Sequence, residues 1–370
     1  MALTLAGPFR VTTLATAALD HPQITGRILP PLPLHGMPRP ARVLRLAARR
    51  YRPLLWSREL LALRDELAGE RFDLVVCHDL DLLPLAAGVA ASGRLVFDAR
   101  EYYPRHFEDR LTWRLLYGPL NRRLCRDFLP ACDLVLTVSD GLAAEYRRVF
   151  GVTPRVAPSL PPFHDLEPSP VDPERIQLVH HGWANRSRRI EGMIEMMDHA
   201  DGRFALDLLL MPMEAGYDRF LERQAARRGN VRILPPVAYE RLIPSTNAYD
   251  LGVFLCPPTT FNLRHALPNK LFEFIQARLA VAIGPSPEMQ AVVERHGCGA
   301  VAPDFEPRSL AATLNSLSAE SIRGMKARAH EAAAVLHAGT TGRELLTELE
   351  RLLRADRDPA ARPRRSGGPV

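Results

Sequence analysis

The feature that most constrains the fold is the alternation of short apolar segments with amphipathic helical patterns along most of the chain. The apolar segments contain few polar residues, which is typical of parallel strands covered on both faces. Strands that alternate with helices predict a doubly wound α/β fold class. The segments predicted as strands are residues 10–16, 73–78, 94–99, 133–139, 176–182, 205–211, 231–235, 250–256 and 280–284.

A proline-rich segment divides this pattern into two halves. Seven of the 21 residues in 154–174 are proline, and proline is poorly tolerated inside helices and central strands. The length of 370 residues also suits two domains. We therefore expect an N-terminal domain (1–158), a linker (159–174), a C-terminal domain (175–338), a helix returning towards the first domain (339–355) and a disordered tail (356–370).

The composition argues against several classes of protein. No apolar run is long enough for a transmembrane helix, and the first residues lack the pattern of a signal peptide. The five cysteines form no CxxC pair, so we expect buried thiols in a reducing compartment and a cytoplasmic location. The net charge of +6 suits an anionic ligand or membrane. Because the basic residues are not clustered with aromatic ones, we expect no nucleic-acid partner.

The most informative segment, 257–284, leads from a strand through a polar loop into a helix expected to begin near Pro268. A helix start favours an anion, and Lys270 adds a full positive charge there. Only two of the 48 basic residues are lysines, and a compact ammonium suits a phosphate. Glu273 lies on the same side as Asn269 and Lys270 and could accept both hydroxyls of a ribose. The alternative is a solvated ion pair between Lys270 and Glu273.

A second polar loop follows the strand that ends at Gly182, and a helix is expected to start near Ser187. Three arginines crowd this helix start, where a cation is unfavourable unless an anion is also bound. They are Arg186, Arg188 and Arg189. Their arrangement predicts a clamp on a diphosphate. The alternative is a set of solvated side chains in an arginine-rich chain.

These segments carry a resemblance to a known family. The order strand, HxGW, loop, RR and helix, followed by LPNKLFEFIQARLAVAIGPSPEM, resembles the donor-binding half of GT-B glycosyltransferases and is most similar to retaining glycosyltransferase family four. Residues 72–86, 94–104 and 133–151 resemble the acceptor half. The resemblance covers residues 70–355. It implies two Rossmann-like, doubly wound parallel-sheet domains with an interdomain cleft.

The resemblance also implies roles for individual residues. Glu273 matches the second glutamate of the family's Glu-x7-Glu motif, which holds the donor's ribose. The residues that match contacts with the donor diphosphate are Gly182, Arg188, Arg189, Asn269 and Lys270. Those expected beside the donor sugar are His265, Leu267 and Pro268, and those expected beside the base are Ile233, Leu234, Pro235 and Pro236.

Three departures from the family pattern modify these expectations. His265 stands where the first glutamate of the motif would fall, so the contact with the donor sugar differs. Arg100 stands where the family often has a histidine between alanine and glutamate, so His78 or Arg100 would take over its contact with the transferred sugar. The start of the chain reads like the end of the family's first helix. We therefore expect the first strand and the acceptor loop of the N-terminal domain to be missing.

The mechanism that the resemblance implies is electrostatic, because Lys270, the arginines and a helix start would stabilise the departing diphosphate. A retaining transfer by front-face departure needs no side-chain nucleophile. An inverting transfer needs a base, for which Asp98 or Glu101 is a candidate. Asp79-Leu80-Asp81 has a D-x-D pattern but is better explained as a helix start capped by Asp79. GT-B enzymes generally need no metal, so the resemblance implies none. We expect no cofactor beyond a nucleotide-sugar co-substrate linked to UDP or GDP.

Residues 37–70 contain two arginine-rich helical patterns with leucines and Trp56. They could rest on the inner face of an anionic membrane, or they could pack on the first sheet. The sequence thus predicts a cytoplasmic glycosyltransferase whose acceptor is a glycan, a lipid-linked sugar or a small molecule. The alternatives are a nucleotide-sugar epimerase of the same architecture and a non-catalytic nucleotide-sugar-binding partner subunit.

Overall fold

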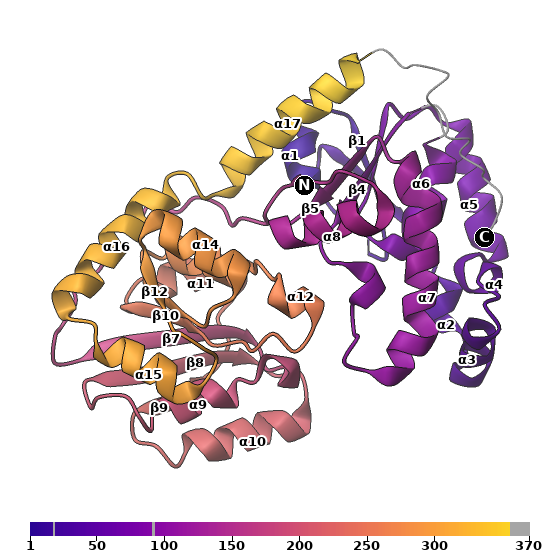
Figure 1. The fold of residues 1–370 in the computed structure, drawn as a ribbon. Coiled ribbons are helices and arrows are strands. Elements are labelled where there is room, and N and C mark those ends of the chain that lie inside the picture. The colour runs from indigo at the N-terminus through magenta and orange to yellow at the C-terminus, as the bar shows by residue number, and fades with distance from the viewer. Residues whose placement is uncertain (18, 91–92, 356–370) are drawn as a thin grey trace. The chain divides into compact units, whose positions relative to one another are not determined.

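The computed structural model describes residues 1–17, 19–90 and 93–355, and the chain divides into two compact units. Unit 1 comprises Met1–Ala157 and the chain from Gly342 onwards, and unit 2 comprises Pro158–Thr341. Each unit has its own parallel sheet, as Figure 1 shows. The predicted tail at 356–370 lies outside the described residues.

The main sheet of unit 1 has four parallel strands in the order β3-β4-β5-β6. A helix at the N-terminus, α1 (Ala2–Ala6), leads into a separate parallel pair, β1 (Val11–Ala15) and β2 (Ile24–Ile28). This agrees with the expectation that the chain starts with a helix running into a strand. The strands of the main sheet are β3 (Leu74–Cys77), β4 (Arg94–Ala99), β5 (Leu134–Thr137) and β6 (Arg155–Val156).

Apolar side chains hold the helices of unit 1 against its strands. Val96 and Leu136 of the main sheet pack with Leu345 and Leu349 of α17 (Ala338–Arg354), so the last helix belongs mostly to unit 1. The other helices described in this unit are α2 (Pro33–Gly36), α3 (Arg39–Ala47), α4 (Arg52–Leu55), α5 (Arg58–Gly69), α6 (Leu83–Val89), α7 (Leu111–Phe128) and α8 (Asp140–Phe150), with the 3-10 turns η1 (Leu80–Leu82), η2 (Tyr103–Arg105) and η3 (Leu129–Ala131).

The sheet of unit 2 has six parallel strands in the order β12-β11-β10-β7-β8-β9. Counted along the chain from β7 and read from the β9 edge, this is the order 3-2-1-4-5-6 of a Rossmann sheet. In such sheets ligands bind beyond the carboxyl ends of the strands where the order reverses, here between β7 and β10. The strands are β7 (Ile176–Trp183), β8 (Phe204–Met211), β9 (Val231–Leu234), β10 (Leu251–Phe254), β11 (Ala280–Ile283) and β12 (Gly299–Val301).

Helices cover both faces of the unit 2 sheet. Leu178 and Val179 are adjacent in β7 and pack into different apolar clusters, as the alternation of side chains along a strand requires. The first cluster includes α9 (Glu191–Met196), α10 (Ala215–Ala225) and α15 (Pro307–Asn315), and the second includes α11 (Tyr239–Thr246), α13 (Asn269–Gln276), α14 (Pro287–His296) and α16 (Ala319–Ala333) (Figure 1). The predicted α/β fold class with parallel sheets is confirmed.

The proline-rich segment forms no helix or strand over 159–172, but it packs closely on unit 2. Leu160 and Leu166 contact the apolar cluster around α13. Arg278 is buried, with a φ of 62°, and its guanidinium donates hydrogen bonds to the carbonyl oxygens of His164 (2.6 Å) and Leu166 (3.0 Å). The segment expected as a separate linker is therefore a surface layer of unit 2.

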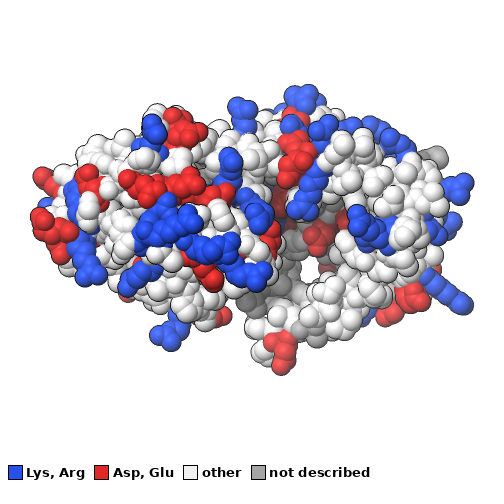
Figure 2. Space-filling view, turned by 90° about the horizontal axis from the view of Figure 1, so that it is seen from below, with Lys and Arg blue, Asp and Glu red and all other residues white. Residues whose placement is uncertain are grey.

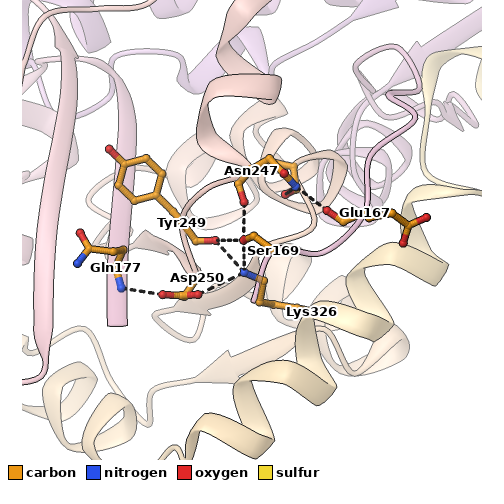
Figure 3. A network of polar contacts seen from close by, with 8 residues as sticks. Glu167, Ser169, Gln177, Asn247, Tyr249, Asp250 and Lys326 are labelled. Carbon is orange, nitrogen blue, oxygen red and sulfur yellow. Dashed lines mark hydrogen bonds and ion pairs between the residues drawn. The ribbon is translucent and has the colours of Figure 1, made fainter. Parts of the chain in front are cut away.

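A buried ammonium group fixes the other end of this segment. Lys326 on α16 is 1% exposed, and its Nζ donates to Ser169 Oγ (2.8 Å), to the carbonyl of Tyr249 (2.9 Å) and to Asp250 Oδ1 (3.3 Å). The Asp250 carboxylate also accepts a hydrogen bond from the amide of Gln177 (2.8 Å), as Figure 3 shows. One of the two lysines of the chain thus joins the proline-rich segment to the starts of β7 and β10.

Candidate functional site

A buried histidine near the end of β7 lies where the strand order of unit 2 reverses. The Nδ1 atom of His180 is 2.8 Å from the carbonyl oxygen of Val253, and its Nε2 atom is 3.0 Å from Nζ of Lys270. A carbonyl can only accept and an ammonium can only donate, so Nδ1 carries the proton and Nε2 accepts from Lys270. Burial, and then the charge of Lys270, lower the pKa of His180 well below its usual value, which keeps the ring neutral.

Lys270, in the first turn of α13, points towards the strand end at Gly182. Its Nζ lies 4.3 Å from the centre of the Phe254 ring. A Cβ atom added to Gly182, whose φ is 122°, would lie 3.4 Å from Lys270 Nζ and 3.8 Å from Arg188 Nη1. Both cations therefore converge on Gly182. Burial, and then the charge of Arg188, lower the pKa of Lys270 well below its usual value, so the two cations form a site that an anion would stabilise.

The start of α13 adds to this positive field. Pro268 occupies the N-cap position and offers no side-chain hydrogen bond to the first turn. The N–H groups of that turn therefore depend on other acceptors, and negative charge is favourable near them. Asn269, the first residue of the helix, is exposed.

Glu273 lies one turn further along α13 and is buried beside a second histidine. Its Oε2 atom is 3.7 Å from Nε2 of His181, a buried nitrogen that has no hydrogen-bond partner among the described residues. Burial raises the pKa of Glu273, although the charge of Lys270 opposes this rise. Burial, and then Lys270, lower the pKa of His181 to about 3. A carboxylate in this position keeps oxygen lone pairs to accept the hydroxyls of a ribose.

The prediction of a helix that starts near Ser187 is wrong. Residues Arg186–Arg188 form a short 3-10 turn, η4, and the Asn185 side chain caps it by accepting a hydrogen bond from the Ser187 amide (2.8 Å). Arg189 then adopts a left-handed conformation with a φ of 48°. This conformation interrupts the helix, so α9 begins only at Glu191.

The three arginines of this loop have different surroundings. Arg186 lies over the ring of Tyr217 and pairs with Glu214 (3.4 Å). Arg189 is exposed. Arg188 is the arginine whose side chain lies near Gly182 and Lys270. Of the three arginines, it is therefore placed best for the predicted diphosphate clamp.

The residues predicted beside the donor sugar lie next to α13. His265 ends the short helix α12 (Phe261–Arg264), and its Nδ1 atom lies 3.0 Å from Oε1 of Glu288, in the first turn of α14. Leu267 packs against the apolar cluster of α13. A carboxylate is therefore held near position 265, where the sequence has a histidine. Ile233 and Leu234, predicted beside the base, end the edge strand β9, and Pro235 and Pro236 follow it.

The polar residues predicted as catalytic in unit 1 belong to two separate groups of contacts. Asp98, at the end of β4, lies 2.9 Å from Nδ1 of His78 and accepts a hydrogen bond from Arg100 Nε (3.1 Å). Burial raises the pKa of the Asp98 carboxyl, but its hydrogen bond to His78 and the charge of Arg100 have a larger combined effect, so its pKa is lowered. Glu101 instead pairs with Nε2 of His106 at 2.6 Å. Asp98 thus orients His78, and Glu101 belongs to a different contact that sequence reasoning did not predict.

Neither a cluster of metal-binding side chains nor a helix able to cross a membrane occurs among residues 1–17, 19–90 and 93–355. Asp79 precedes η1, but its side chain makes no capping hydrogen bond to that turn. The side-chain cap expected from Asp79 is therefore wrong.

Comparison with solved structures identifies the architecture. Sucrose-phosphate synthase from Thermosynechococcus elongatus matches with a TM-score of 0.74 at 15% identity, over 96% of this chain and 92% of that chain. HepE of Anabaena, solved with UDP, matches with a TM-score of 0.68 at 15% identity, over 94% of each chain. The UDP-forming α,α-trehalose-phosphate synthase from Burkholderia vietnamiensis matches with a TM-score of 0.65 at 13% identity, over 95% and 98%. The fold is GT-B.

Sequence comparison supports the same assignment. Residues 9–168 match the model of Glycosyltransferase Family 4, and no curated protein sequence matches the chain. The predicted resemblance to GT-B glycosyltransferases is confirmed. The family match lies in the N-terminal half of this GT-B chain, whereas the motifs around Gly182 and Lys270 lie in its second Rossmann-like unit.

Proposed function

We propose that the protein transfers a sugar from a nucleoside-diphosphate sugar to an acceptor. The observation that carries the proposal is the convergence of Lys270 and Arg188 on the strand end at Gly182. UDP is the first candidate for the nucleotide, because HepE was solved with UDP and the trehalose-phosphate synthase is described as UDP-forming. GDP is the second candidate.

The chemistry follows from where negative charge develops. As the bond between the sugar and the β-phosphate breaks, the departing oxygen becomes an anion that Lys270, Arg188 and the start of α13 would stabilise. The neutral ring of His180 holds Lys270 in position for this interaction. Since the protein's own cations balance the charge, we propose a step without a metal or cofactor.

Unit 1 supplies a group that could accept a proton from the acceptor. Asp98 is committed to His78 and Arg100, so the Nε2 atom of the partly exposed His78 is the proton acceptor that we propose for an inverting transfer. A retaining transfer would not require it. We propose a glycan, lipid-linked or small-molecule acceptor and a cytoplasmic protein, peripheral to the membrane if the acceptor is lipid-linked.

Binding of UDP, GDP, ADP, CDP and dTDP to matched variants tests the site. UDP at ~100 times its dissociation constant should stabilise the protein by about 2.7 kcal/mol. Lys270→Ala and Glu273→Ala should lose this effect, whereas Arg323→Ala, a charge removal on the exposed side of α16, should retain it. Unchanged affinity for every nucleotide in both site variants would show that the assignment is wrong.

Turnover separates the proposed activity from its alternatives. Release of UDP from a UDP-sugar, with or without an acceptor, would support a transferase. Recovery of an isomerised donor without release of UDP would indicate an epimerase. Binding of the donor without any turnover would indicate a non-catalytic partner subunit.

A further inference from the structure

Helix α3 exposes apolar side chains, unlike the second helix predicted from the same arginine-rich segment. Helix α5 buries Leu60 and Leu67, so ordinary packing accounts for it. Helix α3 buries Leu46, but Leu44 is 69% exposed and Val43 is 37% exposed. Helix α3 therefore presents Leu44, and part of Val43, to solvent.

The start of α7 adds a second exposed apolar row. Leu111 and Leu115 are 62% and 64% exposed and share one face of the helix, and Phe107 just before the helix is 41% exposed. Helices α3 and α7 are in contact, and both reach the lower side of unit 1 in Figure 1. We call Val43, Leu44, Phe107, Leu111 and Leu115 the apolar surface. They are five of the 13 large apolar side chains exposed among the described residues. Exposed apolar side chains concentrated on two contacting helices indicate an interaction site.

Positive charge accompanies the apolar surface. Residues 21–58 contain eight arginines and no acidic residue, and Arg110 and Arg114 follow at the start of α7. Residues 103–117 contain two acidic residues, of which Glu108 pairs with Arg105 and Asp109 is exposed. Figure 2, which views the molecule from this side, shows broad uncharged areas in the right-hand part of the picture, with basic and some acidic side chains at their margins.

We propose that the apolar surface binds a membrane that contains anionic phospholipids. Exposed leucines and a phenylalanine can enter the boundary between headgroups and acyl chains, while the surrounding arginines attract anionic headgroups. The excess of arginine over acidic residues in these segments favours an anionic lipid surface over a second copy of this basic chain. If the proposed function holds, this contact would keep unit 1 close to lipid-linked acceptors. Membrane binding itself does not depend on that function.

Flotation of the full-length protein with lipid vesicles tests the proposal. The protein should bind vesicles of phosphatidylcholine with one-third phosphatidylglycerol, and should bind pure phosphatidylcholine vesicles at least about tenfold more weakly. Added salt should release it from the anionic vesicles. The triple variant Leu44→Asp, Leu111→Asp, Leu115→Asp should lower the partition coefficient at least about tenfold.

A matched control places the same change on unit 2. Val335 is 53% exposed, so the variant Val335→Asp should bind vesicles like the unmodified protein. Both variants should keep their melting temperature and their affinity for UDP, because all the changed side chains are exposed.

Several outcomes would overturn the proposal. Equal binding to neutral and anionic vesicles, or equal binding by the triple variant and the unmodified protein, would do so. A protein that is dimeric without lipid and becomes monomeric in the triple variant would instead identify the apolar surface as an interface between copies. Vesicle binding without any UDP binding in the unmodified protein would defeat the proposed function alone.

Discussion

The two lysines of the chain occupy buried positions of opposite character. Lys326 donates to oxygen atoms, including the Asp250 carboxylate, whereas Lys270 has a neutral imidazole, an aromatic ring and the nearby cation of Arg188. A buried cation that lacks an anionic partner is unfavourable. The site around Lys270 therefore raises the free energy of the unliganded protein, and a bound diphosphate would lower it again.

Lys270→Met should stabilise the unliganded protein and abolish UDP binding. The side chain keeps a similar volume and loses its charge, so we expect a gain of about 0.5–2 kcal/mol at neutral pH. Lys326→Met should instead destabilise the protein by about 3–5 kcal/mol, because Asp250 would remain buried without its partner. Urea denaturation and calorimetric titration with UDP measure both effects. Equal destabilisation by the two changes would contradict this distinction.

His181 should make the stability of the fold sensitive to acid. Its pKa falls from 6.5 to about 3 on folding, so between these values the unfolded chain binds a proton that the folded chain does not. The stability that the neutral His181 ring contributes is complete above pH 6.5. It is lost as the pH decreases towards 3, by up to about 1.4 kcal/mol of unfolding free energy per pH unit. His181→Gln should flatten the dependence of the urea midpoint on pH. An unchanged dependence in this variant would contradict the role assigned to His181.

At the scale of elements, the position of α13 depends on a glycine in the neighbouring strand. A Cβ atom on Gly252 of β10 would lie 2.2 Å from the ring of Phe274 on α13. The absence of a side chain there lets the helix lie against the strand, which brings Lys270 to Phe254 and His180. The close contact of β10 with α13 therefore contributes to the geometry of the candidate site.

Gly252→Ala should push α13 away from the sheet. We expect a loss of about 1–3 kcal/mol in stability from overpacking, together with weaker binding of UDP. Gly202→Ala is the control, since a Cβ there would meet no atom within 4 Å. Chemical denaturation and UDP titration test both variants. Full UDP affinity in a destabilised Gly252→Ala protein would show that the site tolerates movement of the helix.

The elements that sequence reasoning identified are those with a strong local signal. Buried strands such as β4 and β8 are continuous apolar runs, and α13 begins beside the expected Pro268. The short strands β2, β6 and β12 were not predicted, since none has a long apolar run. The hydrogen bond between His180 and Lys270 joins residues 90 positions apart. It depends on β7 lying next to β10, an order that residue spacing does not reveal.

At the scale of the whole molecule, the candidate donor site lies entirely in unit 2, although the family match covers mainly unit 1. Binding of UDP should therefore slow amide hydrogen exchange most strongly in 180–189 and 254–274. Lys270→Ala should remove this protection. Mass spectrometry of peptides measures it, and strongest protection in the strands β3 to β6 would place the nucleotide in the wrong unit for the proposed mechanism.

The attachment of the proline-rich segment to unit 2 has a consequence for recombining this protein with other proteins of the GT-B fold. Arg278 and Lys326 are buried and donate to residues 164, 166 and 169. A crossover point after residue 174 would replace these acceptors with foreign sequence, so Arg278 and Lys326 would each lose part of their hydrogen bonding and keep the acceptors at Gln276, Tyr249 and Asp250. A chimera that exchanges donor specificity should therefore transfer Pro158–Thr341 as one block, with its proline-rich segment included.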